Sequence, residues 1–182
     1  DVADALIEKM KQNGAVVVTS SQTAQLEKVV LNEEGHPHRD YIGRDASVIL
    51  DAIGVKVPRE TRIILAEVPQ SHPFVQEELM MPLLPFVRVA NFEEGLEKAK
   101  EAEHGFRHTA MLHSRNMDRV TRFAREMNVT MLIVNGMCGN VLASQGEGYA
   151  AMTIAGTTGE GITTPRSFCK MRRLTFKDQL NV

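Results

Sequence analysis

A pair of adjacent acids is the strongest candidate for chemistry in this chain of 182 residues. Glu77 and Glu78 open the segment Glu-Glu-Leu-Met-Met-Pro, which lies between apolar runs at 61–66 and 83–89. A carboxylate at the carboxyl end of a strand can accept both hydroxyls of a ribose, because its two oxygens match the spacing of the diol. The alternative is a solvated acid in the first turn of a short helix, where glutamate is common.

The six histidines form no recognisable metal or catalytic pattern. His36 and His38 flank a proline in a polar loop, and no cysteine or third ligand is close in sequence. That spacing fits no usual zinc site. His108 and His113 surround an expected strand and differ by an odd number, so they would face opposite sides. We therefore expect no metal site, and surface or satisfied core positions for these side chains.

Two further motifs invite a functional interpretation. Cys138 could be a nucleophile if a base, a cation or a helix N-terminus activated it, but the sequence shows none of these convincingly. An inert cysteine is the expectation there and at Cys169. Residues 156–161, Gly-Thr-Thr-Gly-Glu-Gly, could cradle a phosphate through backbone N–H groups. They lack the Lys-Ser/Thr of a P-loop, and a tight structural loop explains them equally well.

The composition excludes several classes of protein. The net charge is −2, and aromatic residues make up 5% of the chain with no tryptophan, so we expect no binding of nucleic acid. No apolar run approaches the roughly 20 residues that cross a bilayer, so we expect no membrane segment. Two separated cysteines argue against a disulfide scaffold and favour a reduced, cytoplasmic protein.

Alternating helices and strands must position these candidates. Strands are expected at 15–18, 61–66, 83–89, 108–113 and 130–134, all rich in apolar residues. Helices are expected to begin at Thr19 or Ser20, at Asn91 and at Asn116, whose side chains suit N-caps. This alternation predicts a single three-layer α/β/α domain with a mainly parallel sheet and helices on both faces. The residues between Arg172 and Phe176 alternate like a half-exposed final strand.

The order of these features resembles the aldehyde dehydrogenase superfamily over the whole chain. Residues 77–85 resemble its signature Glu-Glu-Ile-Phe-Gly-Pro-Val, and the elements at 108–135, the glycine-rich loop and the final strand follow in the same order. Met80 and Met81 replace the phenylalanine and glycine of that signature, as is usual in the CoA-acylating branch. Other segments are similar to the propionaldehyde and acetaldehyde dehydrogenases of bacterial microcompartments, namely 41–46, 52–58, 108–110, 146–149, 159–161 and 164–168.

This resemblance implies oxidation of a short-chain aldehyde to an acyl-CoA with NAD and coenzyme A, through a thiohemiacetal and a thioester on cysteine. Glu78 matches the acid that binds the nicotinamide-side ribose. The nucleophilic cysteine is expected upstream of Asp1, and the nucleotide-binding domain is expected outside the chain as well. We therefore expect no catalytic residue within these 182 residues, and no activity from this chain alone.

The resemblance also implies an organisation and partners. It divides the chain into part of a catalytic domain, 1–168, and a tail, 169–182, whose strand between Arg172 and Phe176 joins a sheet with a neighbouring subunit. A homo-oligomer follows from this, and a microcompartment, with its shell as a partner, is an expected location. The alternatives are the aldehyde half of a bifunctional aldehyde–alcohol dehydrogenase, a glutamyl-phosphate reductase, or a binding or assembly module without catalysis.

Overall fold

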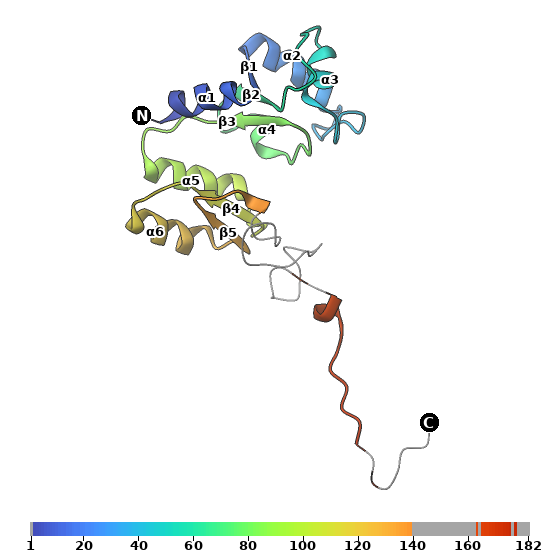
Figure 1. Cartoon of the computed structure of the whole chain (residues 1–182), viewed down its shortest axis with the longest axis vertical. Coiled ribbons are helices and arrows are strands. Elements are labelled where there is room, and N and C mark those ends of the chain that lie inside the picture. The colour runs from blue at the N-terminus through green and yellow to red at the C-terminus, as the bar shows by residue number, and fades with distance from the viewer. Residues whose placement is uncertain (1, 140–162, 164, 176, 178–182) are drawn as a thin grey trace. The chain divides into compact units, whose positions relative to one another are not determined.

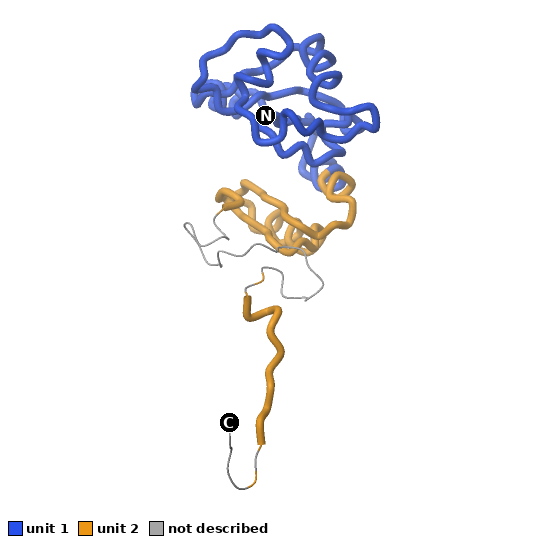
Figure 2. Tube along the Cα trace, turned by 90° about the vertical axis from the view of Figure 1, so that its right-hand side faces the viewer, with its two compact units in different colours: residues 1–98 blue, residues 99–182 orange. Residues whose placement is uncertain are grey.

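A computed structural model of the chain describes residues 2–139, 163, 165–175 and 177 (Figure 1). The chain groups into two compact units, residues 1–98 and 99–182 (Figure 2). The boundary between them falls inside one helix, α5 (Phe92–Glu103). The expected α/β class with parallel strands is confirmed, but the described strands form two separate sheets where a single one was expected.

The first unit is built on a three-stranded parallel sheet. Its strands are β1 (Ala15–Val18), β2 (Ile63–Glu67) and β3 (Leu83–Phe86), with β2 in the centre. The register pairs Val16 with Ile64, and Ile64 with Leu83. The strands expected at 15–18, 61–66 and 83–89 are therefore confirmed, with the last one ending earlier than expected.

Four helices belong to this unit: α1 (Ala3–Gln12), α2 (Ser20–Val30), α3 (Ala46–Asp51) and the short α4 (Pro73–Gln76). The expected cap at Thr19 is confirmed as a capping box, in which its side chain and that of Gln22 each accept from the other residue's backbone N–H. Gly14, with a φ of +94°, turns the chain from α1 into β1.

One face of this sheet carries most of the core. Ile64, Ala66 and Leu83 pack there with side chains from α2, α3 and α4: Leu26, Val30, Ile49, Leu50 and Phe74. The opposite face is covered less completely. Leu65 is buried there, but its neighbours in the register, Val17 and Leu84, are 39% and 41% exposed. Helix α1 contains no buried residue, so helices cover the two faces unequally.

Arg88 links three segments of the first unit. Its Nη2 donates to Asp4 Oδ1 of α1 at 2.6 Å, and its Nε donates to Glu67 Oε1 at the end of β2 at 3.0 Å. These two hydrogen bonds raise the pKa of Arg88 above its ordinary value, and the bond to Asp4 has the larger effect. The guanidinium also lies over the ring of Phe86, 5.9 Å from its centroid. The group is exposed, so it contributes to orientation more than to stability.

The second unit contains a two-stranded parallel sheet, β4 (Thr109–Leu112) and β5 (Met131–Val134), joined by α6 (Met117–Met127). The cap expected at Asn116 is confirmed, because its side chain accepts from the backbone of Asp118 and Arg119. The cap at Asn91 is confirmed as well, since Asn91 Oδ1 accepts from the backbone N–H of Glu94. Both helices therefore begin where the sequence predicts.

Helix α6 is tied to the end of α5 by Glu126. Its carboxylate accepts from Arg122 Nε at 2.7 Å and from Lys100 Nζ at 3.2 Å. Both bonds lower the pKa of Glu126, and the bond from Arg122 has the larger effect. Apolar contacts come from Phe123 and Met127, which are buried together with Met131 and Ile133 of β5. A small apolar core and a surface ion network thus both stabilise this unit.

The final strand expected between Arg172 and Phe176 does not appear among the described residues. The described residues Arg172 to Thr175 are exposed and belong to no strand, and Phe176 lies outside the described residues. Residues 156–161 lie outside them too. Pairing of this segment with a neighbouring subunit therefore remains a prediction. In the part of the chain that is described, no helix has the length and apolar character needed to span a membrane.

Truncating the central strand should destabilise the first unit strongly. Ile64 is completely buried in β2, so we expect Ile64→Ala to lower the free energy of unfolding by about 2–5 kcal/mol, as buried isoleucine truncations do. Val48→Ala is the control, because Val48 is 46% exposed on α3 and should change stability by less than about 1 kcal/mol. Urea unfolding measures both; equal effects of the two variants would contradict this packing.

Candidate functional site

The acidic segment forms the return from α4 to β3. Helix α4 begins at His72, whose ring Nδ1 accepts from the backbone N–H of Phe74 at 3.2 Å, and Pro73 follows at the first helical position. The helix ends at Gln76, and Glu77 caps it with a backbone N–H that donates to the carbonyl of Pro73. Glu78 therefore lies beyond the helix, in a short connection that enters β3.

This placement corrects two details of the sequence interpretation. Glu78 is not a first-turn helical acid, because α4 has already ended at Gln76. It also does not directly follow the carboxyl end of a strand, since α4 intervenes after β2 and Glu78 precedes β3. Apolar periodicity could not show this, because a four-residue helix is too short to give a pattern.

The two acids have different environments. Glu77 Oε2 lies 3.1 Å from His36 Nδ1, a contact between residues far apart in sequence. Glu78 is exposed, and none of its contacts within the described chain is a hydrogen bond or an ion pair. Its carboxylate oxygens are therefore available to a ligand. Of the two acids, only Glu78 has a carboxylate without such a partner, and Glu78 is the residue that the family resemblance matches to a ribose-binding acid.

The backbone around Glu78 is fixed on both sides. Leu79 is buried, and the carbonyl of Met80 accepts from the backbone N–H of Gly43 at 3.1 Å. Met80 adopts a φ of +52°, a left-handed conformation that is uncommon for a side chain of this kind. With the His36 contact at Glu77, the connection therefore has contacts on both sides of the exposed acid, at residues 77, 79 and 80. The Glu78 carboxylate therefore extends from a backbone segment that neighbouring contacts hold in place.

The other candidates are not brought to this acid. His36 contacts Glu77, whereas His108 and His113 flank β4 in the second unit. Within the described ranges, no group of three or more possible ligands could hold a metal ion. The two cysteines, Cys138 and Cys169, are free and exposed, so the cysteine at 138 is not buried as an inert residue would usually be.

A reciprocal contact that the sequence did not predict ties the ends of β4 and β5. Asn135 Oδ1 accepts from Ser114 N at 2.9 Å, and Asn135 Nδ2 donates to the Ser114 carbonyl at 2.8 Å. Asn135 has a φ of +55°, which asparagine tolerates better than most residues. The only signal in the sequence was the Asn-Gly pair after the strand, which indicates a turn but names no partner.

Comparison with known proteins identifies the family. A family model described as Aldehyde dehydrogenase family matches residues 17–161. The chain belongs to the aldehyde dehydrogenase family. The acetylating acetaldehyde dehydrogenase EutE of Salmonella typhimurium is 42% identical over 186 residues, covering 100% of this chain. The chain spans 40% of the length of that relative. The family resemblance predicted from the acidic signature is therefore confirmed.

Solved structures support the same assignment. Propionaldehyde dehydrogenase of Rhodopseudomonas palustris, solved with bound CoA and an acylated cysteine, is 43% identical with a TM-score of 0.89 over 93% of this chain and 39% of its own. A propionaldehyde dehydrogenase from a fucose-utilisation microcompartment of Clostridium phytofermentans is 38% identical with the same TM-score of 0.89, over 98% of this chain and 41% of its own. The fold of this aldehyde dehydrogenase segment is thus the fold of that group.

The contact between His36 and Glu77 should reduce local opening of the segment that carries Glu78. Both side chains are partly exposed, so the pair is worth at most about 1 kcal/mol. We expect His36→Ala to speed amide hydrogen exchange at residues 77–80 by up to about fivefold, and His113→Ala, in the other unit, to leave it unchanged. Mass-spectrometric hydrogen exchange measures this; identical protection in both variants would mean that the contact does not hold the segment.

Proposed function

We propose that this chain is a segment of a CoA-acylating aldehyde dehydrogenase. The enzyme converts a short-chain aldehyde, NAD and coenzyme A into an acyl-CoA, NADH and a proton. The observation that carries the proposal is the agreement over the full chain with acetylating acetaldehyde dehydrogenase, together with a free carboxylate at the family's signature acid. The likeness extends over all residues of the chain, which favours this function over a more distant member of the superfamily.

Glu78 is the residue that we assign to cofactor binding. Its carboxylate is exposed and makes no ion pair or hydrogen bond in the described structure, and its two oxygens suit the two hydroxyls of a ribose. When bound, NAD supplies a nicotinamide ring that accepts hydride from the aldehyde carbon. The role of Glu78 is to orient the ribose attached to that ring. The contacts at Glu77, Leu79 and Met80 keep the acid at a constant position.

The nucleophile lies outside this chain in the proposed enzyme. Cys138 is exposed, and the thiol of Cys169 donates to the Pro165 carbonyl, so neither thiol is paired with a described base. We therefore expect residues 1–182 to form no acyl-CoA by themselves. Activity of this chain that is lost in Cys138→Ala would instead assign the nucleophile to Cys138 and would overturn this part of the proposal.

Removing the charge of Glu78 should slow turnover more than it weakens binding of NAD. In the full-length enzyme, Glu78→Gln should lower kcat about tenfold to a hundredfold, because a lost charged hydrogen bond costs roughly 1.5–3 kcal/mol. The dissociation constant of NAD should change less, since its other contacts remain. Glu33→Gln, an exposed acid in a loop, is the control. Stopped-flow and steady-state measurement of NADH formation separates these effects, and an unchanged kcat would argue against the assignment.

We also propose that the tail between Arg172 and Phe176 pairs with a neighbouring subunit. Arg172 to Thr175 are exposed and form no strand within one chain, so their backbone groups are open to another edge. The microcompartment origin of the Clostridium relative supports an enclosed location for this enzyme, with the shell as its surroundings.

Deleting the tail tests that assembly role. We expect removal of residues 171–182 from the full-length enzyme to reduce its oligomeric state, as measured by light scattering during size-exclusion chromatography. Replacing Lys177 with glutamine, which leaves the proposed strand intact, should preserve the oligomer. A deletion variant with the same mass as the parent enzyme would show that the tail is not an assembly element.

A further inference from the structure

His72 lies at the start of the short helix that leads to Glu78. It is the N-cap of α4, and its backbone N–H donates to the Pro69 carbonyl at 3.0 Å. Helix α4 has only four residues, and so short a helix is not stable by its own hydrogen bonds. The helix therefore depends on the groups at its two ends, and Glu78 lies two residues beyond its last residue, Gln76.

The imidazole ring of His72 supplies the bond at the amino end of α4. Its Nδ1 accepts from the backbone N–H of Phe74 at 3.2 Å, which pairs one of the donors that a helix start leaves open. An Nδ1 atom that accepts this bond carries no proton, so the neutral ring holds its proton on Nε2. The Glu27 carboxylate of α2 lies 3.4 Å from that Nε2 and attracts the proton. A residue of another helix thus favours the tautomer that caps α4.

Packing holds the same ring in place. The His72 side chain is 15% exposed, and its ring lies edge-on to that of Phe74, with 4.6 Å between the centroids. Phe74 is buried in the apolar core together with side chains of α2 and α3. Both side chains of the pair His36–Glu77 are more exposed than His72. Of the two histidine contacts around this segment, the one at His72 is therefore the better fixed.

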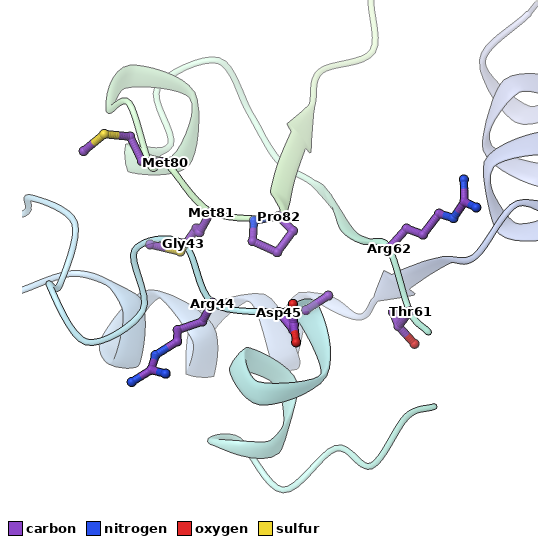
Figure 3. Close-up of a pocket in the computed structure, with 9 residues that line it drawn as sticks. Gly43, Arg44, Asp45, Thr61, Arg62, Met80, Met81 and Pro82 are labelled. Carbon is purple, nitrogen blue, oxygen red and sulfur yellow. The ribbon is translucent and has the colours of Figure 1, made fainter. Parts of the chain in front are cut away.

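A second contact holds the connection on the far side of Glu78. The backbone N–H of Gly43 donates to the Met80 carbonyl at 3.1 Å, and Figure 3 shows both residues at the edge of one pocket. This bond fixes the connection shortly before it enters β3, whereas the cap at His72 fixes the start of α4. The Glu78 side chain makes no hydrogen bond or ion pair within the described chain. The position of its carboxylate therefore follows from these two ends.

We propose that His72 is a positioning residue for Glu78. As the tautomer with its proton on Nε2, it caps α4 and so sets the place at which the Glu78 carboxylate meets the ribose. Loss of the ring leaves the Phe74 N–H without its acceptor, so α4 opens from its amino end and the carboxylate samples several positions. The inference rests on the proposed function, because it explains how the acid assigned to the cofactor is held. Its effect on turnover passes through Glu78.

The test uses variants of the full-length enzyme. His72→Ala should lower kcat about threefold to tenfold, with a smaller change in the dissociation constant of NAD, and should speed amide hydrogen exchange at residues 77–80 about fivefold. His72→Asn should restore both properties, because asparagine is a favoured N-cap whose Oδ1 accepts the same bond. Asn116→Ala removes the cap of α6 in the second unit and is the matched control. It should leave kcat and exchange at 77–80 as in the parent.

A double-mutant cycle decides whether the effect passes through Glu78. His72→Ala should change kcat little in the Glu78→Gln enzyme, whereas the losses from two independent residues would multiply. Multiplied losses, failure of His72→Asn to restore kcat, or parent-like exchange at 77–80 in His72→Ala would overturn the inference. If Glu78→Gln leaves kcat unchanged, or if the parent forms no acyl-CoA, the proposed function fails instead. Exchange at 77–80 then still shows whether His72 holds this segment.

Discussion

Burial of the central strand β2 is the constraint on which the first unit depends. Ile64 and Ala66 are completely buried and Leu65 is 1% exposed, and β2 is the only described strand with partners on both sides. Its amino-terminal end is held by neighbours on both sides, because Arg62 N–H donates to the Gly14 carbonyl and Ile64 N–H donates to the Pro82 carbonyl, each at 2.8 Å. The residues that follow β2 lead through α4 to Glu78. Glu78 is thus placed by a strand whose position follows from apolar burial.

The strands and helix starts were predictable because their causes are local. Apolar runs mark β2 and β3, and short polar side chains at Thr19, Asn91 and Asn116 bond to nearby backbone N–H groups. The separation of β4 and β5 from the first sheet was not predictable, since the same apolar runs fit one sheet or two. The tail shows the same limit, because alternation predicts a strand only where a partner edge exists.

The candidate site depends on a contact between residues that are distant in sequence. Glu77 and Glu78 are adjacent and chemically identical, so their sequence context could not say which carboxylate is free. The distinction comes from His36, a residue distant in sequence, which contacts Glu77 and leaves Glu78 open. The resemblance to the family signature did point to Glu78, but it gave no physical reason for that choice.

Met80 connects the acidic segment to the residues that precede α3. Its left-handed φ of +52° is costly for a residue with a side chain, and such conformations persist where surrounding contacts impose them. Here the contact is the bond from Gly43 N–H to the Met80 carbonyl, which joins the acidic segment to the stretch that carries Arg44 and Asp45. A ribose bound at Glu78 would therefore contact a segment whose backbone is hydrogen-bonded to the residues before α3.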